Sequence, residues 1–328
     1  MRRRAFIKLL GGAAVVWPLA ARSQQQKIPV VGYLSAFPPE GIALSNLAAF
    51  RKGLAEAGFT EGRNLAVVYR WADGHYDRLP AMAADLVRLD VSVIATAATP
   101  AAIAAKSATT TIPIVFSVGN DPVQLGLVAS LARPGGNVTG AARLNQELGP
   151  KRLDLMHELV PTATRIALIV NSTDGGTSEP QQRATEAAAR TLGLQLHILR
   201  ASNEAEIDEA FATLMREQAG ALVITNDAYF SSRMAQFAAL ALRHRVPTIY
   251  SYREFTAAGG LMSYSASFAD SYRIAGTYVG RILKGEKPAG LPVQQSTEIE
   301  LFINVKTAKA LGLVVPIALR LRATEVFE

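Results

Sequence analysis

Residues 28–69, IPVVGYLSAFPPEGIALSNLAAFRKGLAEAGFTEGRNLAVVY, decide the fold. The apolar run at 28–34 predicts a buried strand. Residues 44–57 then place apolar side chains at helical spacing, and Gly58 follows where a helix commonly ends on glycine. The apolar run at 65–69 predicts the next strand. A strand, a helix and a strand at this spacing indicate a parallel sheet covered by helices.

The same alternation continues along the chain in two series. Residues 50–69 and 183–200 look alike, since both run from a helix through a glycine into a strand. In the first series we predict further strands at 91–95 and 114–117, and helices at 76–89, from Pro100 onward and at 124–132. In the second series we predict strands at 165–170, 194–199, 221–225 and 247–250, and helices at 151–160, 180–192, 203–217 and 231–243. We therefore expect an α/β protein with two doubly wound parallel-sheet lobes.

The last part of the chain predicts elements beyond these two series. They are a strand at 260–264, a helix at 268–283 and a strand at 298–305. We expect the chain to return to the first lobe and cross once more, which makes a hinge with a cleft that closes on a ligand. The predicted lobes are an N-terminal lobe of residues 28–140 plus 258–288 and a C-terminal lobe of residues 141–257 plus 289–328.

Residues 1–23 have the features of an export signal. They contain five basic residues, no acidic one and an apolar stretch too short to span a membrane comfortably. Small residues at Ala21 and Ser23 suit cleavage before Gln24. Arg3-Arg4-Ala5-Phe6-Ile7-Lys8 resembles the twin-arginine consensus, although an ordinary secretory leader is the alternative. We expect a periplasmic protein.

Composition excludes several classes of protein. The 328 residues carry a net charge of +7, but without the five basic leader residues 29 bases face 27 acids, a net +2. A nucleic-acid partner is therefore not expected.

The absence of cysteine excludes disulfides, thiolate metal sites and a lipid-modified N-terminal cysteine. The motifs of hydrolases, zinc proteases and phosphate-binding loops are missing, and the four histidines are scattered. We predict no enzyme, no metal and no cofactor.

Two long motifs resemble a known bacterial family. They are GNDPVQLGLVASLARPGGNVTG at 119–140 and the stretch from Tyr252 to Leu313, which begins YREFTAAGGLMSYSASFADSYRIAGTYVGRILKGEKPAG. Both motifs resemble those of ABC-transporter substrate-binding proteins of the tryptophan/tyrosine type. The resemblance to this family extends over nearly the whole mature chain. The resemblance implies a type I periplasmic-binding-protein fold, a small-molecule ligand, and an ABC permease with its ATPase as partners. We expect a monomer.

One loop departs from the pattern of that family. Members that bind aromatic amino acids often carry Gln and His after the first strand, whereas this sequence has SAFPPE at 35–40. This departure argues against an aromatic amino acid as the ligand. The predicted cleft places hydroxyl groups at helix starts opposite one acid, an arrangement that suits a zwitterion, so we expect an amino acid or a related small carboxylate.

Residues that follow the predicted strands are the candidate ligand contacts, because ligands in open α/β sheets bind beyond the carboxyl ends of the strands. The candidates are Ser35, Thr96, Ala97, Thr99, Ser117, Gly119 and Asp121 in the first lobe, and Asn171, Asn226, Asp227, Tyr229 and Tyr252 in the second. Hydroxyl groups before a helix suit an anion such as a carboxylate. Thr99 and Asp121 are alternatively helix caps.

Asp227 has two possible roles. The family resemblance implies that an acid at this place pairs with the ammonium group of the ligand. A cap for the helix near Ser231 is the alternative. Tyr229, Tyr252 and Phe37 are possible ring contacts to a ligand or packing residues.

Three other functions are compatible with the same fold. A sensor that signals to a membrane receptor is not separable from an importer component by sequence. A repressor-type regulator needs an N-terminal helix-turn-helix, and residues 1–27 offer a leader instead. An enzyme on this fold is disfavoured by the missing motifs.

Overall fold

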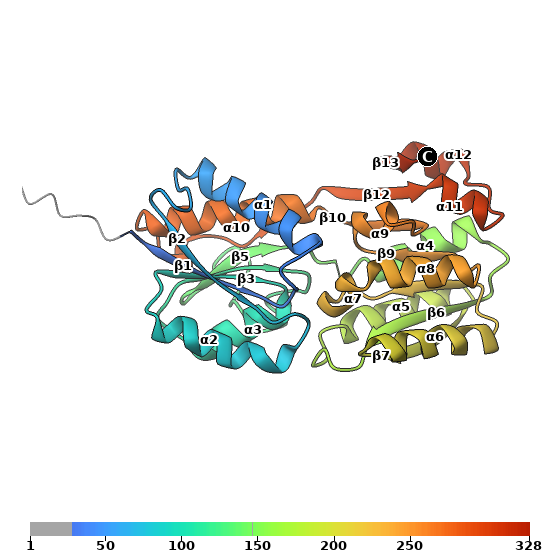
Figure 1. Cartoon of the computed structure of the whole chain (residues 1–328), viewed down its shortest axis with the longest axis horizontal. Coiled ribbons are helices and arrows are strands. Elements are labelled where there is room, and N and C mark those ends of the chain that lie inside the picture. The colour runs from blue at the N-terminus through green and yellow to red at the C-terminus, as the bar shows by residue number, and fades with distance from the viewer. Residues whose placement is uncertain (1–27, 146) are drawn as a thin grey trace, which may run out of the picture.

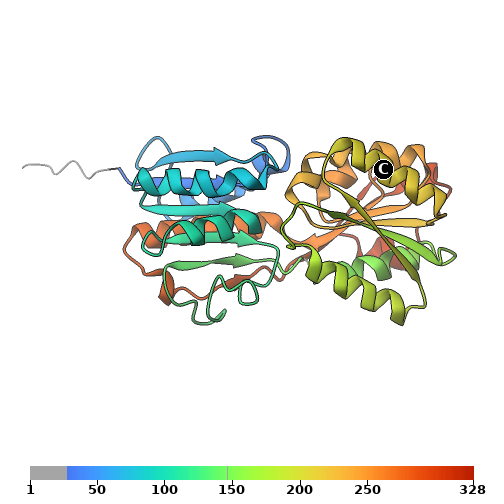
Figure 2. The same ribbon diagram turned by 90° about the horizontal axis from the view of Figure 1, so that it is seen from below.

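The structure, a computed structural model, describes residues 28–145 and 147–328 (Figure 1). It consists of two lobes that lie side by side, each built around one sheet with helices on both faces (Figure 2). The predicted α/β fold with two lobes is confirmed. The leader, with its predicted cleavage site and paired arginines, lies outside the described residues.

The first lobe contains a parallel sheet. Its strands are β1 (Val30–Ser35), β2 (Ala66–Trp71), β3 (Val93–Ala97), β4 (Ile114–Val118), β5 (Val138–Ala142) and β11 (Gln294–Gln295). Its helices are α1 (Ile42–Glu56), η1 (Tyr76–Arg78), α2 (Leu79–Arg88), α3 (Thr99–Ala108), α10 (Phe268–Leu283) and η2 (Pro288–Gly290). The strand order is β11-β5-β4-β3-β1-β2, and all neighbours are parallel. Helices α1 and α10 cover one face, and α2 and α3 cover the other (Figure 1).

The second lobe contains a larger sheet. Its strands are β6 (Arg165–Asn171), β7 (Gln195–Ala201), β8 (Ala221–Ile224), β9 (Thr248–Tyr250), β10 (Met262–Ala266), β12 (Ile299–Asn304) and β13 (Glu325–Phe327). Its helices are α4 (Gly149–Leu159), α5 (Glu179–Thr191), α6 (Glu204–Arg216), α7 (Ala228–Ser232), α8 (Met234–Arg243), α9 (Arg253–Ala257), α11 (Val305–Ala310) and α12 (Ile317–Arg322). The order is β13-β12-β10-β9-β8-β6-β7. Strand β12 runs antiparallel to β10, which departs from the all-parallel sheets predicted.

The central strands of both lobes are buried on both faces, as continuous apolar runs predict, whereas the edge strands β2, β7, β11 and β13 are partly exposed. In the first sheet Val31 of β1 lies in register with Val67 of β2 and Val93 of β3. The main apolar core runs through the first lobe and continues onto the α6 and α8 side of the second sheet. A smaller core fills the α4 side of that sheet. The carboxyl ends of the parallel strands can therefore hold polar residues in fixed positions between the lobes.

The chain crosses between the lobes three times, at places that differ from the predicted boundaries. The crossings lie between β5 and α4, between β10 and α10, and between β11 and β12. The prediction placed β10 in the first lobe and β11 in the second, and both assignments are wrong. Strand β10 pairs with β9 and β12 inside the second sheet, whereas β11 pairs with β5. Apolar periodicity identifies a strand but not the sheet that it joins.

The helix predicted at 124–132 is wrong. This segment forms turns, and Gly126 adopts a left-handed backbone with φ 64°. The N–H groups of Leu127 and Val128 both return to the carbonyl of Pro122, at 2.8 and 3.3 Å, instead of continuing a helical pattern. The following strand β5 was not predicted, because its sequence VTGAA is short and only weakly apolar.

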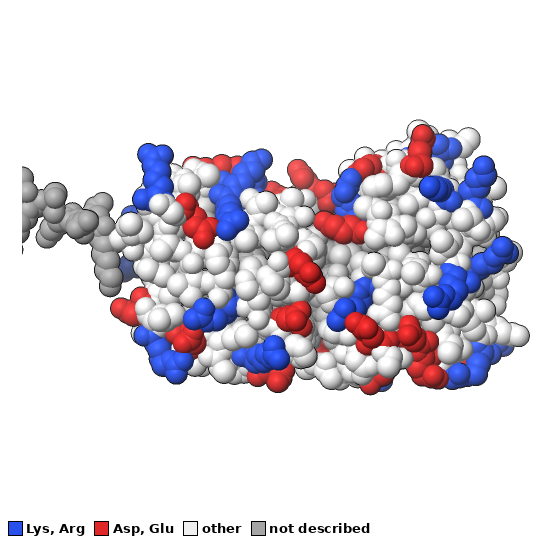
Figure 3. All heavy atoms as spheres, viewed as in Figure 1, with Lys and Arg blue, Asp and Glu red and all other residues white. Residues whose placement is uncertain are grey.

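Charged side chains of both signs are interspersed over the two lobes on the face that Figure 3 shows. Among the described residues, no helix is long and apolar enough to cross a membrane.

Candidate functional site

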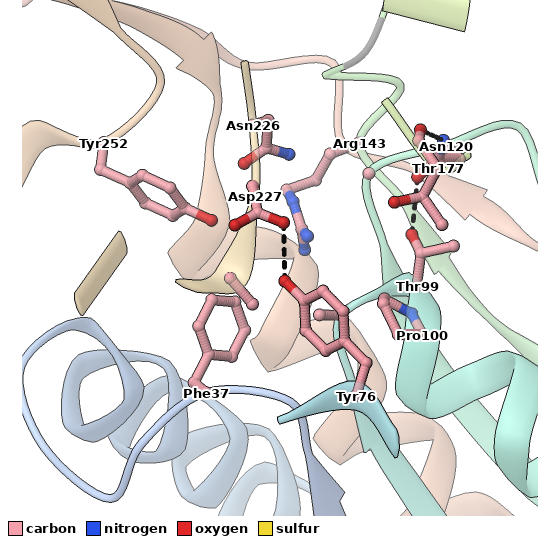
Figure 4. Close-up of a pocket in the computed structure, with 13 residues that line it drawn as sticks. Phe37, Tyr76, Thr99, Pro100, Asn120, Arg143, Thr177, Asn226, Asp227 and Tyr252 are labelled. Atoms are coloured by element: carbon pink, nitrogen blue, oxygen red, sulfur yellow. Dashed lines mark hydrogen bonds between the residues drawn. The ribbon is translucent and has the colours of Figure 1, made fainter. Parts of the chain in front are cut away.

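A cavity lies between the lobes at the carboxyl ends of the parallel strands (Figure 4). Its empty volume is about 350 Å³, open mouth included. The first lobe lines it with Phe37, Tyr76, Ala98, Thr99, Pro100, Gly119, Asn120 and Arg143, and the second with Thr177, Asn226, Asp227, Ala228 and Tyr252. Both lobes contribute polar groups, as a site that closes around a small ligand requires.

The start of α3 forms one wall of the cavity. Ala98, just before the helix, has φ 75°, a left-handed backbone that is uncommon for a residue other than glycine. The Thr99 hydroxyl donates to Oδ1 of Asn120 at 2.7 Å rather than capping the helix. Nδ2 of Asn120 then donates across the cavity to the Thr177 carbonyl at 2.7 Å. The N-terminal end of α3, with its positive dipole, therefore faces the cavity.

Asp227 caps α7, so one of its two predicted roles is confirmed. Its Oδ1 accepts the N–H of Phe230 at 2.9 Å and Nδ2 of Asn171 at 3.1 Å. Burial raises the pKa of the Asp227 carboxyl, and these hydrogen bonds act in the opposite direction. The carboxylate therefore has much of its hydrogen-bonding capacity used by the protein.

Tyr76 connects the lobes through Asp227. Its hydroxyl donates to Oδ2 of Asp227 at 2.6 Å and accepts the N–H of Tyr229 at 3.2 Å. Burial and the nearby Asp227 charge raise the pKa of Tyr76 well above its usual value, so the phenol keeps its proton and remains a donor.

Two glycines of the first lobe show how closely the lobes approach. A Cβ at Gly74 would lie 2.9 Å from the Tyr229 ring. A Cβ at Gly119 would lie 2.8 Å from Nδ2 of Asn226. Together with the Tyr76 and Asn120 hydrogen bonds, these contacts describe a closed cleft.

Arg143 lies directly after β5 and points into the middle of the cavity (Figure 4). Its side chain is buried, with the residue only 4% exposed. Nη1 donates to the hydroxyls of Ser117 and Ser271 at 2.5 and 3.1 Å. The guanidinium lies over the rings of Phe268 and Tyr272, at 4.4 and 5.5 Å from their centroids.

Within residues 28–145 and 147–328, no carboxylate pairs with the charge of Arg143. Among the described residues it forms no ion pair, and its buried Nε has no hydrogen-bond partner. Burial lowers the pKa of Arg143, and the groups that oppose this effect are tyrosines rather than acids. A buried charge without a partner is costly, and because this one lines the cavity, Arg143 is a candidate contact for an anionic ligand group.

Five of the predicted contacts line the cavity, namely Thr99, Gly119, Asn226, Asp227 and Tyr252. The other seven, Ser35, Thr96, Ala97, Ser117, Asp121, Asn171 and Tyr229, do not. Ser35 accepts the N–H of Phe37 at 3.1 Å and so orients that ring. Ser117 and Asn171 hold Arg143 and Asp227 from behind. Thr96 and Ala97 are buried at the end of β3.

Asp121 stabilises a turn. Its Oδ1 accepts the N–H of Val123 at 2.8 Å, but no helix follows for it to cap. It lines a separate hollow together with Glu147 and Arg183. Burial and the neighbouring Asp121 charge raise the pKa of Glu147.

Sequence reasoning missed Tyr76, Arg143 and Thr177. Tyr76 begins the short helix η1 and Thr177 lies in a turn before α5, so each stands several residues beyond the end of the preceding strand. Arg143 follows a strand that was not predicted. The available signal was a cation three positions after Gly140, the last residue of the first long motif.

Residues 40–327 match the family of ABC transporter substrate-binding proteins. The chain belongs to this family. It is 28% identical over 264 residues to the tyrosine-binding protein of Clostridioides difficile strain R20291, which covers 80% of this chain and 75% of that protein. A conserved domain protein from Vibrio cholerae has 28% identity, covers 92% of this chain and 100% of its own, and has a TM-score of 0.84.

Two solved structures differ in whether a ligand is bound. A Streptococcus pneumoniae ABC domain in complex with L-Trp has 26% identity, covers 91% of this chain and 99% of its own, and has a TM-score of 0.83. A ligand-free, open substrate-binding protein from Clostridium difficile has 25% identity, covers 92% and 99%, and has a TM-score of 0.65. At nearly equal identity the ligand-bound structure is more similar, which agrees with the closed cleft of this chain.

Proposed function

We propose that this protein captures an amino acid or a related small carboxylate between its lobes and delivers it to an ABC permease and ATPase. The observation that carries the proposal is a cavity lined by both lobes, with direct hydrogen bonds across it from Tyr76 and Asn120. A ligand that fills this cavity stabilises the closed form, which a membrane partner can distinguish from the open one. Membership of the substrate-binding family supports the proposal.

The ligand class is tested by a thermal-shift screen of amino acids, small carboxylates, amines and neutral sugars, followed by calorimetry. A ligand at 100 times its Kd is expected to add about 2.7 kcal/mol to stability. We expect the hits among the amino acids and carboxylates. A screen in which only neutral sugars stabilise the protein would refute this ligand class.

Delivery is tested with the permease and ATPase reconstituted in liposomes. We expect ligand-loaded protein to stimulate ATP hydrolysis and ligand uptake. Ligand binding without stimulation, together with capture of a membrane receptor, would instead favour a sensor of the same fold.

Export to the periplasm is proposed from the leader, and its route gives a separate prediction. Replacing Arg3 and Arg4 by lysine should leave the precursor in the cytoplasm if the twin-arginine route is used. Immunoblots of cytoplasmic and periplasmic fractions measure the effect, with Arg22→Lys as the control. Normal export of the double variant would exclude the twin-arginine route and leave an ordinary secretory leader.

A further inference from the structure

We propose that Arg143 binds the carboxylate of the ligand, and that this contact, rather than one to an ammonium group, decides which molecules the cavity accepts. The inference deepens the proposed function and rests on it. If Arg143 makes this contact, the carboxylate of the ligand is essential for binding and an amino group is dispensable. The ligand class is thus small carboxylates, with or without an α-amino group.

The surroundings of the guanidinium leave one particular edge for a ligand. Nη1 is held by Ser117 and Ser271, and the guanidinium carbon lies over the Phe268 ring, 4.4 Å from its centroid. Among the described residues, Nε and Nη2 form no hydrogen bond. These two nitrogens form one edge of the planar group, and a carboxylate binds such an edge through two parallel hydrogen bonds.

The side chain is also fixed before any ligand arrives. Arg143 is 4% exposed and its rotamer is restrained by two hydroxyls and two aromatic rings. Little side-chain entropy is therefore lost when an anion binds, and the fork geometry is already in place. The N-terminal end of α3 lines the same cavity and adds positive potential.

The two charged residues that line the cavity differ in how far the protein itself supplies their partners. Asp227 accepts hydrogen bonds from Tyr76, Asn171 and the N–H of Phe230 without any ligand. Arg143 has two hydroxyl acceptors and no counter-charge. An incoming anion therefore supplies a missing partner, whereas an incoming ammonium would meet a carboxylate that the protein already satisfies.

The first experiment compares matched ligands on the wild-type protein by thermal shift and calorimetry. One set is L-phenylalanine, 3-phenylpropanoate and 2-phenylethylamine, and a second is L-leucine, 4-methylpentanoate and 3-methylbutylamine. We expect the amino acid and the acid of at least one set to bind, and the amine of that set not to bind. The inference would be overturned if, within a set, the amine or the amino acid binds and the matched acid does not.

The second experiment uses variants of Arg143. Arg143→Met should melt no lower than wild type without ligand, because it removes an unbalanced buried charge, and should bind the acid about 100-fold more weakly or worse. Arg143→Lys should keep part of the affinity, since an ammonium group offers a charge without the fork. It also tests the inference if the methionine variant does not fold.

Arg152→Met is the matched control. Arg152 is fully buried too, but its Nε and Nη2 donate to the carbonyls of Tyr264 and Asn145, and it does not line the cavity. We expect this variant to lose stability and, below its melting temperature, to keep the wild-type Kd.

The outcomes separate this inference from the proposed function. Unchanged affinity in Arg143→Met, with a lower melting temperature, would make Arg143 a structural residue and leave the proposed function standing. If no carboxylate or amino acid of the wider screen binds the wild type, the proposed ligand class fails and this inference fails with it.

Discussion

Asp227→Ala is expected to weaken ligand binding by about 10- to 100-fold. The substitution removes the acceptor for the Tyr76 hydroxyl, which is a hydrogen bond between the lobes at 2.6 Å. A hydrogen bond to a charged group contributes about 1.5–3 kcal/mol, and here it stabilises the closed form that holds the ligand. Loss of the α7 cap should lower the stability by about 1 kcal/mol. Calorimetry and thermal melting measure the two effects.

Tyr76→Phe tests whether Asp227 acts through this contact. The ring remains, and only the hydroxyl that donates to Asp227 is lost. If the lobe-to-lobe hydrogen bond is the cause, both single variants and the double variant should lose similar affinity, which a double-mutant cycle detects as strong coupling. Asp154→Ala, which removes a half-exposed acid on α4, is the control and should bind like wild type.

The ammonium role implied by the family resemblance predicts a different pattern. Asp227→Ala would then lose more affinity than Tyr76→Phe, and the excess would appear only for ligands that carry an amino group. Equal losses for L-phenylalanine and 3-phenylpropanoate would assign Asp227 to closing the lobes. An excess for the amino acid alone would contradict that assignment and give Asp227 a direct contact with the ligand.

The fold was predictable because its central strands are buried on both faces. Runs such as RIALIV at 165–170 satisfy the requirement for a continuous apolar strand, and the helix at 268–283 has the predicted bounds. The apolar pattern did not predict strands whose side chains are small or polar, as in β5 and β11. It also failed at 124–132, where Gly126 in a left-handed conformation ends the helical pattern.

The site was predictable only as far as it follows from the sheet. Thr99, Gly119, Asn226, Asp227 and Tyr252 line the cavity because each follows a strand, and parallel strands bring their carboxyl ends to one edge. Tyr76 and Thr177 belong to the site through closure of the lobes, which depends on the geometry of three crossings. Sequence periodicity contains no information about that geometry.

Gly276→Ala is expected to destabilise the first lobe strongly. Gly276 lies on α10 where it packs against α1, and a Cβ there would lie 2.0 Å from the carbonyl oxygen of Phe50 and 2.9 Å from the amide nitrogen of Leu54. These are backbone atoms of α1, so the clash cannot be relieved by a side-chain rotation. Overpacking of this kind costs about 3 kcal/mol, which lowers the melting temperature by several degrees.

The same substitution should also weaken ligand binding, because α10 carries the residues that hold Arg143. Ser271 accepts Nη1 of Arg143, and the guanidinium lies over Phe268 and Tyr272. A helix displaced from α1 moves these groups together, so the loss of affinity should fall on carboxylates in particular. Gly290→Ala is the control, since a Cβ there meets nothing within 4 Å, and its stability should stay within about 0.5 kcal/mol of wild type. If Gly276→Ala melts like this control, α1 and α10 do not need to approach closely, and α10 cannot be the rigid support that presents Arg143 to the ligand.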